Sequence, residues 1–205
     1  MPTPSGGSLS SDMILGMKDV EIEIQVRISK KTNLERFLTK EATFTDKNYQ
    51  KDEYFTPLHR NFTSVRPVAE WLRLRESDTG SITYKNWHYD KNGKSEYCDE
   101  YESQVQDIDQ IRKIFAAIDI KPVITIEKVR KTWMYKEYEI AFDAVTGLGN
   151  FVEIEYKGNK KADPKTITNG MIELLKRIGC GKVERNFVGY PFMLLYPGEV
   201  KFEEV

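Results

Sequence analysis

Hydrophobic and polar residues alternate along several segments of the chain. In VEIEIQVRI, residues 20–28, every second residue is valine or isoleucine, and the positions between them are Glu21, Glu23, Gln25 and Arg27. Alternate side chains of a β-strand share a face, so this segment predicts a strand with one apolar and one polar face. FVEIEYK, residues 151–157, repeats the pattern. Each of the two strands therefore carries a pair of glutamates on one face.

The hydrophobic spacing predicts eight strands and three helices. The strands are expected at residues 20–28, 47–57, 70–76, 81–89, 95–105, 123–135, 137–145 and 150–158. The helices are expected at residues 29–41, 107–119 and 164–178, with Gly179 ending the third. In the second helix the predicted buried stripe is Ile108, Ile111, Ile114, Phe115 and Ile118. The apolar tail 187–198 is expected to pack onto the body of the protein.

The connections between strands predict antiparallel pairing. SDTG and DKNG join successive strands as hairpin turns, and short turns between neighbouring strands give antiparallel ladders. The fold class is therefore α+β, and eight antiparallel strands are enough to close a β-barrel. Residues 1–16, rich in Pro, Gly and Ser, predict a flexible leader, followed by a single domain over residues 17–205.

Composition excludes several classes of partner. The 31 Lys and Arg residues nearly balance the 32 Asp and Glu residues, so no basic bias indicates nucleic acid. No apolar run approaches the ~18 residues of a membrane-spanning helix, and the N-terminus lacks a signal-peptide pattern. Cys98 and Cys180 have neither metal-binding nor redox spacing, which predicts two free thiols in a reducing compartment. We expect a cytoplasmic protein without a membrane or nucleic-acid partner.

Nearly every predicted strand has one charged face. The charged residues that share faces are Arg73 with Arg75, Glu100 with Glu102, Lys128 with Arg130, Glu139 with Asp143 and Glu153 with Glu155, while Lys85 shares a face with Thr83 and Trp87. On any one strand, a solvated outer face with ion pairs explains the pattern. Across all the strands this explanation is weaker, because the charges are close-set with few neutral spacers. If helices cover the apolar face, the charged face must line the interior of the barrel.

Such an interior fits a ligand that carries both signs of charge. Clustered carboxylates suit Mg²⁺ or Mn²⁺, which prefer oxygen ligands, and clustered Arg and Lys suit a polyphosphate. A metal–triphosphate complex satisfies both requirements. The chain has no P-loop motif, and with His59 and His88 as its only histidines it offers no zinc-site pattern.

Several spaced motifs then resemble one family. They are the two glutamates of EIEIQ, QKDEYF, WLRLRE, the lysine of ITYK, EKVRKTW, FDAVTGLGNFVEIE and the ending GYPFMLL. Over residues 20–196 the chain resembles the CYTH proteins, or triphosphate tunnel metalloenzymes, named after class IV adenylyl cyclases and thiamine triphosphatases. It departs from the family's E-x-E-x-K signature at Gln25, where lysine is usual, and Gly189 replaces a usual serine in the ending.

The resemblance implies a fold and a site. The fold would be a closed eight-stranded antiparallel β-tunnel with helices packed outside. The metal, Mg²⁺ or Mn²⁺, would be held by Glu21, Glu23, Glu153 and Glu155. The triphosphate would be bound by Arg27, Arg73, Arg75, Lys85, Lys128 and Arg130. Lys85 and Asp143 would be catalytic, with Asp143 or a hydroxide at the metal site accepting a proton.

The resemblance leaves three activities open. The first is a class IV adenylyl-cyclase-like reaction that converts ATP to cyclic AMP and pyrophosphate, and the GYPFMLL ending favours it. The second is hydrolysis of thiamine triphosphate, inorganic triphosphate or a nucleoside triphosphate. The third is a sensor that binds a triphosphate or nucleotide without turnover, which Gln25 keeps open. We expect ATP or another triphosphate as the ligand, and a homodimer.

Overall fold

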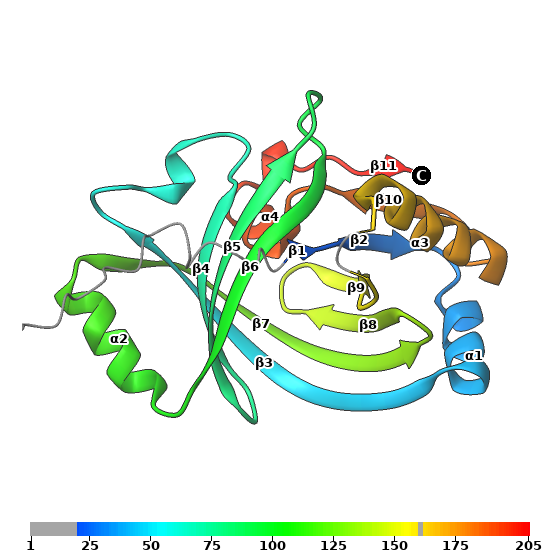
Figure 1. Ribbon diagram of the computed structural model, residues 1–205, viewed down its shortest axis with the longest axis horizontal. Coiled ribbons are helices and arrows are strands. Elements are labelled where there is room, and N and C mark those ends of the chain that lie inside the picture. The colour runs from blue at the N-terminus through cyan, green and yellow to red at the C-terminus, as the bar shows by residue number, and fades with distance from the viewer. Residues whose placement is uncertain (1–19, 160–161) are drawn as a thin grey trace, which may run out of the picture.

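The computed structural model describes residues 20–159 and 162–205. In this part of the chain, eleven strands form one antiparallel sheet in the order β1-β6-β5-β4-β3-β7-β8-β9-β2-β10-β11. Figure 1 shows the long β3 and β7 curving through the middle of this sheet. The strands are β1 (Val20–Glu21), β2 (Glu23–Ile28), β3 (Thr43–Pro57), β4 (Glu70–Glu76), β5 (Gly80–Tyr89), β6 (Ser95–Val105), β7 (Ile120–Tyr135), β8 (Tyr138–Val145), β9 (Gly149–Tyr156), β10 (Val183–Asn186) and β11 (Glu203–Glu204).

The predicted fold class, an antiparallel α+β protein, is confirmed. All eight predicted strands are present, the first of them divided into β1 and β2, and β10 and β11 are additional. As assigned, the ladder is linear, with β1 at one end and β11 at the other, so closure of an eight-stranded barrel is not confirmed. The predicted leader lies outside the described residues.

The first segment of the sheet borders two distant strands. Glu21 of β1 pairs with Cys98 of β6, whereas Glu23 of β2 pairs with Glu155 of β9. Only Ile22 separates β1 from β2, and its carbonyl oxygen accepts a hydrogen bond of 2.9 Å from the backbone nitrogen of Tyr156. Glu21 and Glu23, which lie on the same face, therefore pair with different strands, β6 and β9.

Four α-helices and two short 3₁₀ helices accompany the sheet in the described residues. They are α1 (Lys31–Glu41), α2 (Ile108–Ala117), α3 (Pro164–Ile178) and α4 (Gly189–Leu195), with η2 (Phe62–Ser64) and η3 (Pro197–Glu199). The start and end of α3 follow from its sequence: the Asp163 side chain accepts a hydrogen bond from the Thr166 backbone nitrogen, and Gly179 ends the helix at φ 78°.

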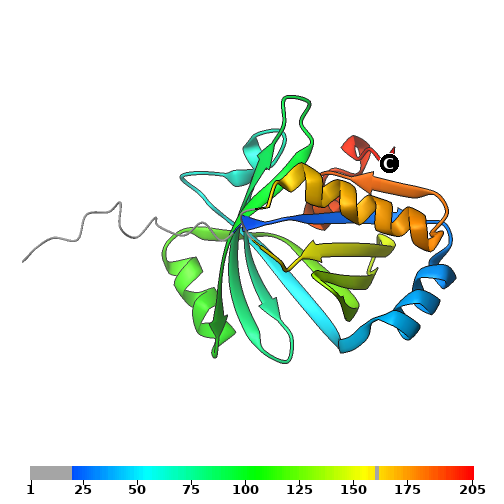
Figure 2. The same ribbon diagram turned by 45° about the vertical axis from the view of Figure 1, so that its right-hand side comes forward.

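The main hydrophobic core lies between α1, α3 and the apolar face of the sheet. Leu34 and Leu38 of α1 and Met171 and Leu175 of α3 pack with alternate residues of β2, β8 and β9, among them Ile24. Figure 2 shows α3 running alongside β2. Because the helices cover the apolar face, the charged side chains at the intervening positions are turned to the opposite, concave side.

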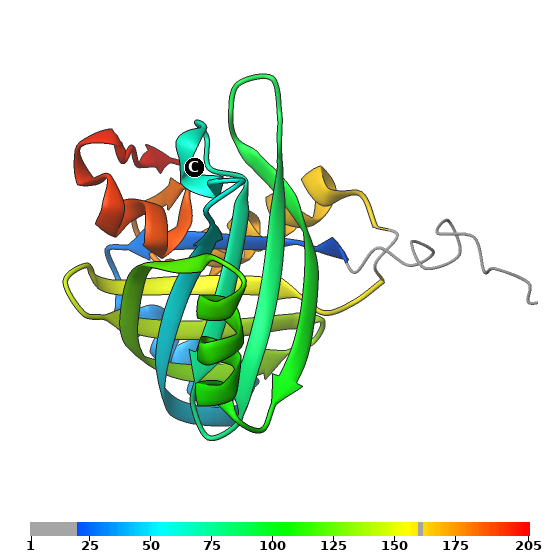
Figure 3. The ribbon, with the colours of Figure 1, turned by 90° about the vertical axis from the view of Figure 1, so that its left-hand side faces the viewer.

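The helix α2 is less buried than its pattern predicts. It covers the same outer side of the sheet near β3, β4 and β5, as Figure 3 shows, where Phe115 packs edge-on against Phe55 with ring centroids 5.1 Å apart. However, Ile114 and Ile118 of the predicted stripe are 51% and 56% exposed. The prediction was wrong there because the helix contacts the sheet along one narrow line, which cannot bury a stripe of that width.

The C-terminal tail packs onto the body as predicted, although its helix was not foreseen. Tyr190, Phe192 and Met193 of α4 join a second core cluster with Trp71 and Phe151 of the sheet. Trp71 shares the charged face of β4, so α4 fills one end of the concave side. Cys98 and Cys180 are free, as predicted, and both are buried. In the part of the chain that the structure describes, every helix is too short or too polar to span a bilayer.

Candidate active site

The charged strand faces line a cavity of about 320 Å³ on the concave side of the sheet. The sequence predicted eleven site residues, and the structure brings nine of them into this lining. They are Glu21, Glu23, Arg73, Arg75, Lys85, Lys128, Arg130, Glu153 and Glu155. Gln25 also lines the cavity, together with Val188, Gly189, Tyr190 and Pro191 at its α4 end.

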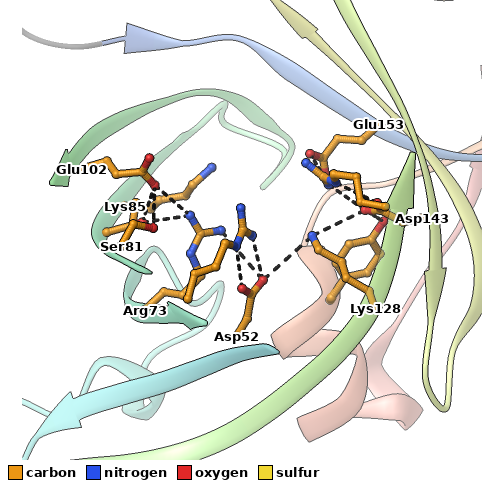
Figure 4. A network of polar contacts seen from close by, with 12 residues as sticks. Asp52, Arg73, Ser81, Lys85, Glu102, Lys128, Asp143 and Glu153 are labelled. Carbon is orange, nitrogen blue, oxygen red and sulfur yellow. Dashed lines mark hydrogen bonds and ion pairs between the residues drawn. The ribbon is translucent and has the colours of Figure 1, made fainter. Parts of the chain in front are cut away.

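The basic half of the cavity is organised around Asp52 of β3. This carboxylate is 2% exposed and accepts hydrogen bonds from Nε and Nη2 of Arg75 at 2.6 and 2.8 Å. Arg73 and Lys128 lie 4.0 and 3.9 Å from it, and Figure 4 shows Asp52 between these two residues. Burial by itself would raise the pKa of Asp52, but the Arg75 hydrogen bonds and the surrounding cations hold that pKa well below its usual range.

A second buried carboxylate, Asp143 of β8, fixes the other side of this half. It accepts hydrogen bonds from Nε and Nη2 of Arg130 at 2.7 and 2.6 Å and from the Tyr190 hydroxyl at 2.9 Å. Lys128 Nζ lies 3.5 Å away. Asp143 is 1% exposed and stands behind the cavity wall formed by Arg130. The cations outweigh burial and hold the pKa of Asp143 well below its usual range.

Lys128 lies between the two carboxylates and near two arginines. Burial and the neighbouring Arg130 lower its pKa to about 8, and Asp143 and Asp52 offset this only in part. A phosphate oxygen at the cavity surface would add negative charge and favour the ammonium form. The basic half is thus prepared for an anion by fixed arginines and by a lysine that the anion would stabilise.

The acidic half surrounds another lysine. Lys85 Nζ donates a hydrogen bond to Glu21 and lies 3.7 Å from Glu23 and 3.3 Å from Glu100. Burial, followed by the charge of Glu23, raises the pKa of Glu21 to about 7. Burial likewise raises the pKa of Glu100 to about 7. The alternation of residues placed Glu100 on a charged face, but no role was predicted for it. In the structure Glu100 pairs directly with Lys85 across β5 and β6.

The donor chemistry of the acidic half fits a hard divalent cation. Glu21, Glu23 and Glu100 converge on one positive group, and their raised pKa values show that more positive charge there would be favourable. As the described side chains stand, with Lys85 between the carboxylates, no group of three Asp, Glu, His or Cys residues has ligand geometry. These three glutamates could hold a divalent cation if Lys85 moved away.

The other two predicted metal ligands have cationic partners of their own. Glu153 accepts a hydrogen bond of 2.7 Å from Arg130, which outweighs burial and lowers the pKa of Glu153. Glu155 pairs with Lys157 at 2.5 Å. Glu153 therefore belongs to the basic half of the cavity, and Glu155 lies beside the acidic half.

Two predicted residues lie outside the cavity lining, namely Arg27 and Asp143. The Arg27 guanidinium stacks over the rings of Phe151 and Phe202, 4.9 and 4.2 Å from their centroids. Arg27 shares a face with Glu23 as predicted, but the cavity lining ends before the strand does. Asp52 appears in the sequence analysis only as part of the QKDEYF motif, and in the structure its carboxylate holds Arg75 in place.

Comparisons with known proteins agree with this geometry. The profile of the CYTH domain matches residues 19–185. The chain belongs to the CYTH family. A protein of Methanocaldococcus jannaschii named "Putative adenylate cyclase MJ0240" is 32% identical over 165 residues, which cover 80% of this chain and 91% of that protein.

Solved structures share this fold. PH1819 from Pyrococcus horikoshii superposes with a TM-score of 0.71 at 24% identity, covering 87% of this chain and 99% of that one. HpAC1 from Hippeastrum, described as a "putative adenylyl cyclase" with a dominant triphosphatase activity, gives a TM-score of 0.61 at 18% identity and covers 87% and 95%. At these identities the likeness concerns the fold alone.

Proposed function

We propose that the protein is a metal-dependent enzyme that cyclises ATP to cyclic AMP and pyrophosphate inside the cavity. One observation carries the proposal: the cations Arg73, Arg75, Lys128 and Arg130, of which Arg73 and Lys128 are buried, line a space of about 320 Å³ together with a cluster of carboxylates. The relative that shares 32% identity over most of both chains is named "Putative adenylate cyclase MJ0240", which supports the choice of reaction.

We further infer that residues 20–28 close the sheet into a tunnel. The segment pairs with β6 through β1 and with β9 through β2, with a single residue between them. Those two strands are otherwise at opposite sides of the ladder. Closure would keep bulk water away from the charged lining, so that electrostatic interactions with a bound triphosphate are stronger than in open solvent.

The chain's own residues would bind and orient the triphosphate. Arg75 and Arg130 offer fixed N–H donors, because Asp52 and Asp143 hold them in bidentate contacts before any ligand arrives. Arg73 is held instead by its hydrogen bonds to Thr83 and Glu102. Donors arranged in advance need no reorganisation when charge develops on the reacting phosphate. A divalent cation held by Glu21, Glu23 and Glu100 would add further positive charge beside the phosphoryl oxygens.

In the proposed reaction the ribose 3′ oxygen forms a bond to the α-phosphorus. The bond between that phosphorus and the bridging oxygen breaks, pyrophosphate leaves, and the proton of the 3′ hydroxyl passes to water. Arg73, Arg75, Lys128 and Arg130 would stabilise the charge on the leaving pyrophosphate. Asp143, with a depressed pKa and its oxygens engaged, would position Arg130 rather than accept the proton.

Hydrolysis of a triphosphate is the second candidate. The cavity volume of about 320 Å³ lies at the lower end of the ~300–1,000 Å³ usual for ligand pockets, which favours a compact ligand such as a triphosphate group. The reaction would transfer the terminal phosphoryl group of inorganic triphosphate, thiamine triphosphate or a nucleoside triphosphate to water. HpAC1, a protein of the same fold, has a triphosphatase activity described as dominant.

One experiment separates the candidates. The protein is incubated with ATP, thiamine triphosphate or tripolyphosphate, each with Mg²⁺ or Mn²⁺, and the products are resolved by chromatography. Glu21→Gln and Glu23→Gln serve as inactive variants, and Glu35→Gln on the exposed face of α1 is the matched control. Cyclic AMP with pyrophosphate supports the cyclase, orthophosphate alone supports the hydrolase, and tight binding without turnover would replace both by a sensor.

A further inference from the structure

A smaller cavity opens beside the first one, between β2, β5 and β10. Its volume is about 30 Å³, roughly twice the ~10–15 Å³ that one water molecule needs. Glu23, Gln25, Trp87, Val188 and Gly189 line both cavities, so the two are adjacent. The space is suited to a couple of water molecules or to one compact oxyanion.

The wall of this smaller cavity contains a buried arginine. Arg185 of β10 is 6% exposed, and its Nη2 donates a hydrogen bond of 3.3 Å to the carbonyl oxygen of Ser95. Its Nε is buried and has no hydrogen-bond partner among the described residues. Within the same residues, no carboxylate lies within 4.0 Å of the guanidinium.

The arginines of the larger cavity differ from Arg185 in this respect. Arg73, Arg75 and Arg130 each contact a carboxylate oxygen at 3.2 Å or less. A buried charge without a partner is unfavourable, and burial lowers the pKa of Arg185 to about 10 because Glu23 and Glu203 compensate only in part. The guanidinium donates one hydrogen bond, to Ser95, and lies over the ring of Phe187, 4.6 Å from its centroid, so most of its five N–H donors are left for an acceptor.

A neutral donor faces the same space. Gln25 accepts a hydrogen bond of 3.0 Å at Oε1 from the Asn186 side chain, and Asn186 is itself fixed because its Oδ1 accepts from the backbone nitrogens of Val188 and Gly189. With Oε1 engaged, the amide nitrogen is the group of Gln25 that is left to donate to a ligand in either cavity. Glu23 is the acidic residue in this wall, and its carboxylate lies 3.7 Å from Lys85. The free hydrogen-bonding groups are thus mainly donors.

We propose that the cavity at Arg185 is a second oxyanion subsite, separate from the four cations of the larger cavity, that binds one phosphoryl group. The group could be supplied by free phosphate or by the end of a polyphosphate that extends from the larger cavity, since the two cavities share a wall. The subsite adds to the proposed function, because the triphosphate-binding residues named above do not include Arg185.

The test measures binding without metal or turnover. Wild type, Arg185→Gln, Arg185→Lys and the exposed control Arg177→Gln are titrated with inorganic phosphate by calorimetry while tripolyphosphate saturates the larger cavity. Wild type and Arg177→Gln should bind one phosphate, Arg185→Lys should bind it more weakly, and Arg185→Gln should lose at least about tenfold in affinity. A second arm compares the affinities of the variants for tripolyphosphate alone.

The two arms distinguish the sources of the phosphoryl group. If tripolyphosphate itself reaches the subsite, wild type binds no further phosphate, and Arg185→Gln weakens tripolyphosphate binding by about tenfold. If Arg185→Gln matches wild type in both arms, the proposal is wrong. If that variant does not fold, wild-type crystals soaked in tungstate test the proposal instead. An anomalous peak beside the Arg185 guanidinium is the expected result, and the absence of a peak there would show that the proposal is wrong. Failure of the proposed enzyme activity would leave these binding results unchanged.

Discussion

The substitution Asp52→Asn removes the charge at the centre of the basic half while keeping the size of the side chain. In the native protein Asp52 accepts two hydrogen bonds from Arg75 and lies about 4 Å from Arg73 and Lys128, with 2% of its surface exposed. Without the carboxylate, three buried cations face one another with less compensation. Removing one partner of a buried ion pair costs about 3–5 kcal/mol.

We expect the lower end of that range, about 3 kcal/mol, because asparagine keeps one oxygen that Arg75 can bond. In a chain of this size the change corresponds to a fall in Tm of about 6–12 °C. Urea unfolding followed by circular dichroism measures the free energy of unfolding, with Asp46→Asn, an exposed position on the same strand, as the matched control. The control should change it by less than about 0.5 kcal/mol.

The pH dependence tests the same reasoning. The pKa of Asp52 is lower in the folded protein than in the unfolded chain, where it is about 3.9. The stability that the Asp52 carboxylate contributes is therefore complete above the pKa of the unfolded chain. It is lost as the pH falls from there towards the pKa of the folded protein. The difference between wild type and Asp52→Asn should therefore be constant from pH 5 to pH 7 and shrink below about pH 4. A difference below about 1 kcal/mol at pH 7, or one that grows on acidification, would refute the argument.

Three further predictions use the same network. Tyr190→Phe removes the hydroxyl that donates to Asp143 and should lower the free energy of unfolding by about 1.5–3 kcal/mol, measured by urea unfolding beside the exposed control Tyr49→Phe. The affinity of the wild type for tripolyphosphate should fall as the pH rises through about 8, because Lys128 then loses its proton. Calorimetry at pH 7 and pH 9 should show a smaller fall in affinity for Lys128→Met than for the wild type. An equal fall in both proteins would contradict the assignment of this pH dependence to Lys128. Gln25→Lys places an ammonium group in the cavity and should tighten tripolyphosphate binding several-fold. The variant also loses the hydrogen bond from Asn186, which should lower the free energy of unfolding by about 1 kcal/mol. An unchanged affinity would show that position 25 lies too far from the ligand.

The alternation of residues predicted the faces of the strands well. Glu23 and Glu155 were assigned to charged faces from parity alone, and the structure places them opposite one another across β2 and β9. The alternation does not show how far along a strand the cavity lining extends. Arg27 lies on the predicted face but near its end, where Phe202 from the C-terminus packs on the guanidinium. That contact joins positions 175 residues apart and has no local signal.

Strand order was the other property that local sequence did not contain. Glu100 meets Lys85 across the hairpin of β5 and β6, but it meets Glu21 because β1 pairs with β6, where the paired positions Glu21 and Cys98 are 77 residues apart in the sequence. The helix α4 was missed for a different reason: seven residues with a proline in third position are too few to establish helical periodicity. In both cases the tertiary structure determined the outcome.

The cavity neutralises its own charges in the absence of a ligand, and this has a thermodynamic consequence. Lys85 compensates Glu21, Glu23 and Glu100, while Asp52, Asp143 and Glu153 compensate the arginines and Lys128. A cation alone must displace Lys85 from its partners, and a triphosphate alone must compete with carboxylates for the arginines. When both bind, the displaced Lys85 gains phosphate oxygens as new partners, so each ligand lowers the cost of binding the other. Mn²⁺ and tripolyphosphate should therefore bind with positive coupling, equal in either order of addition, and Lys85→Met should reduce that coupling.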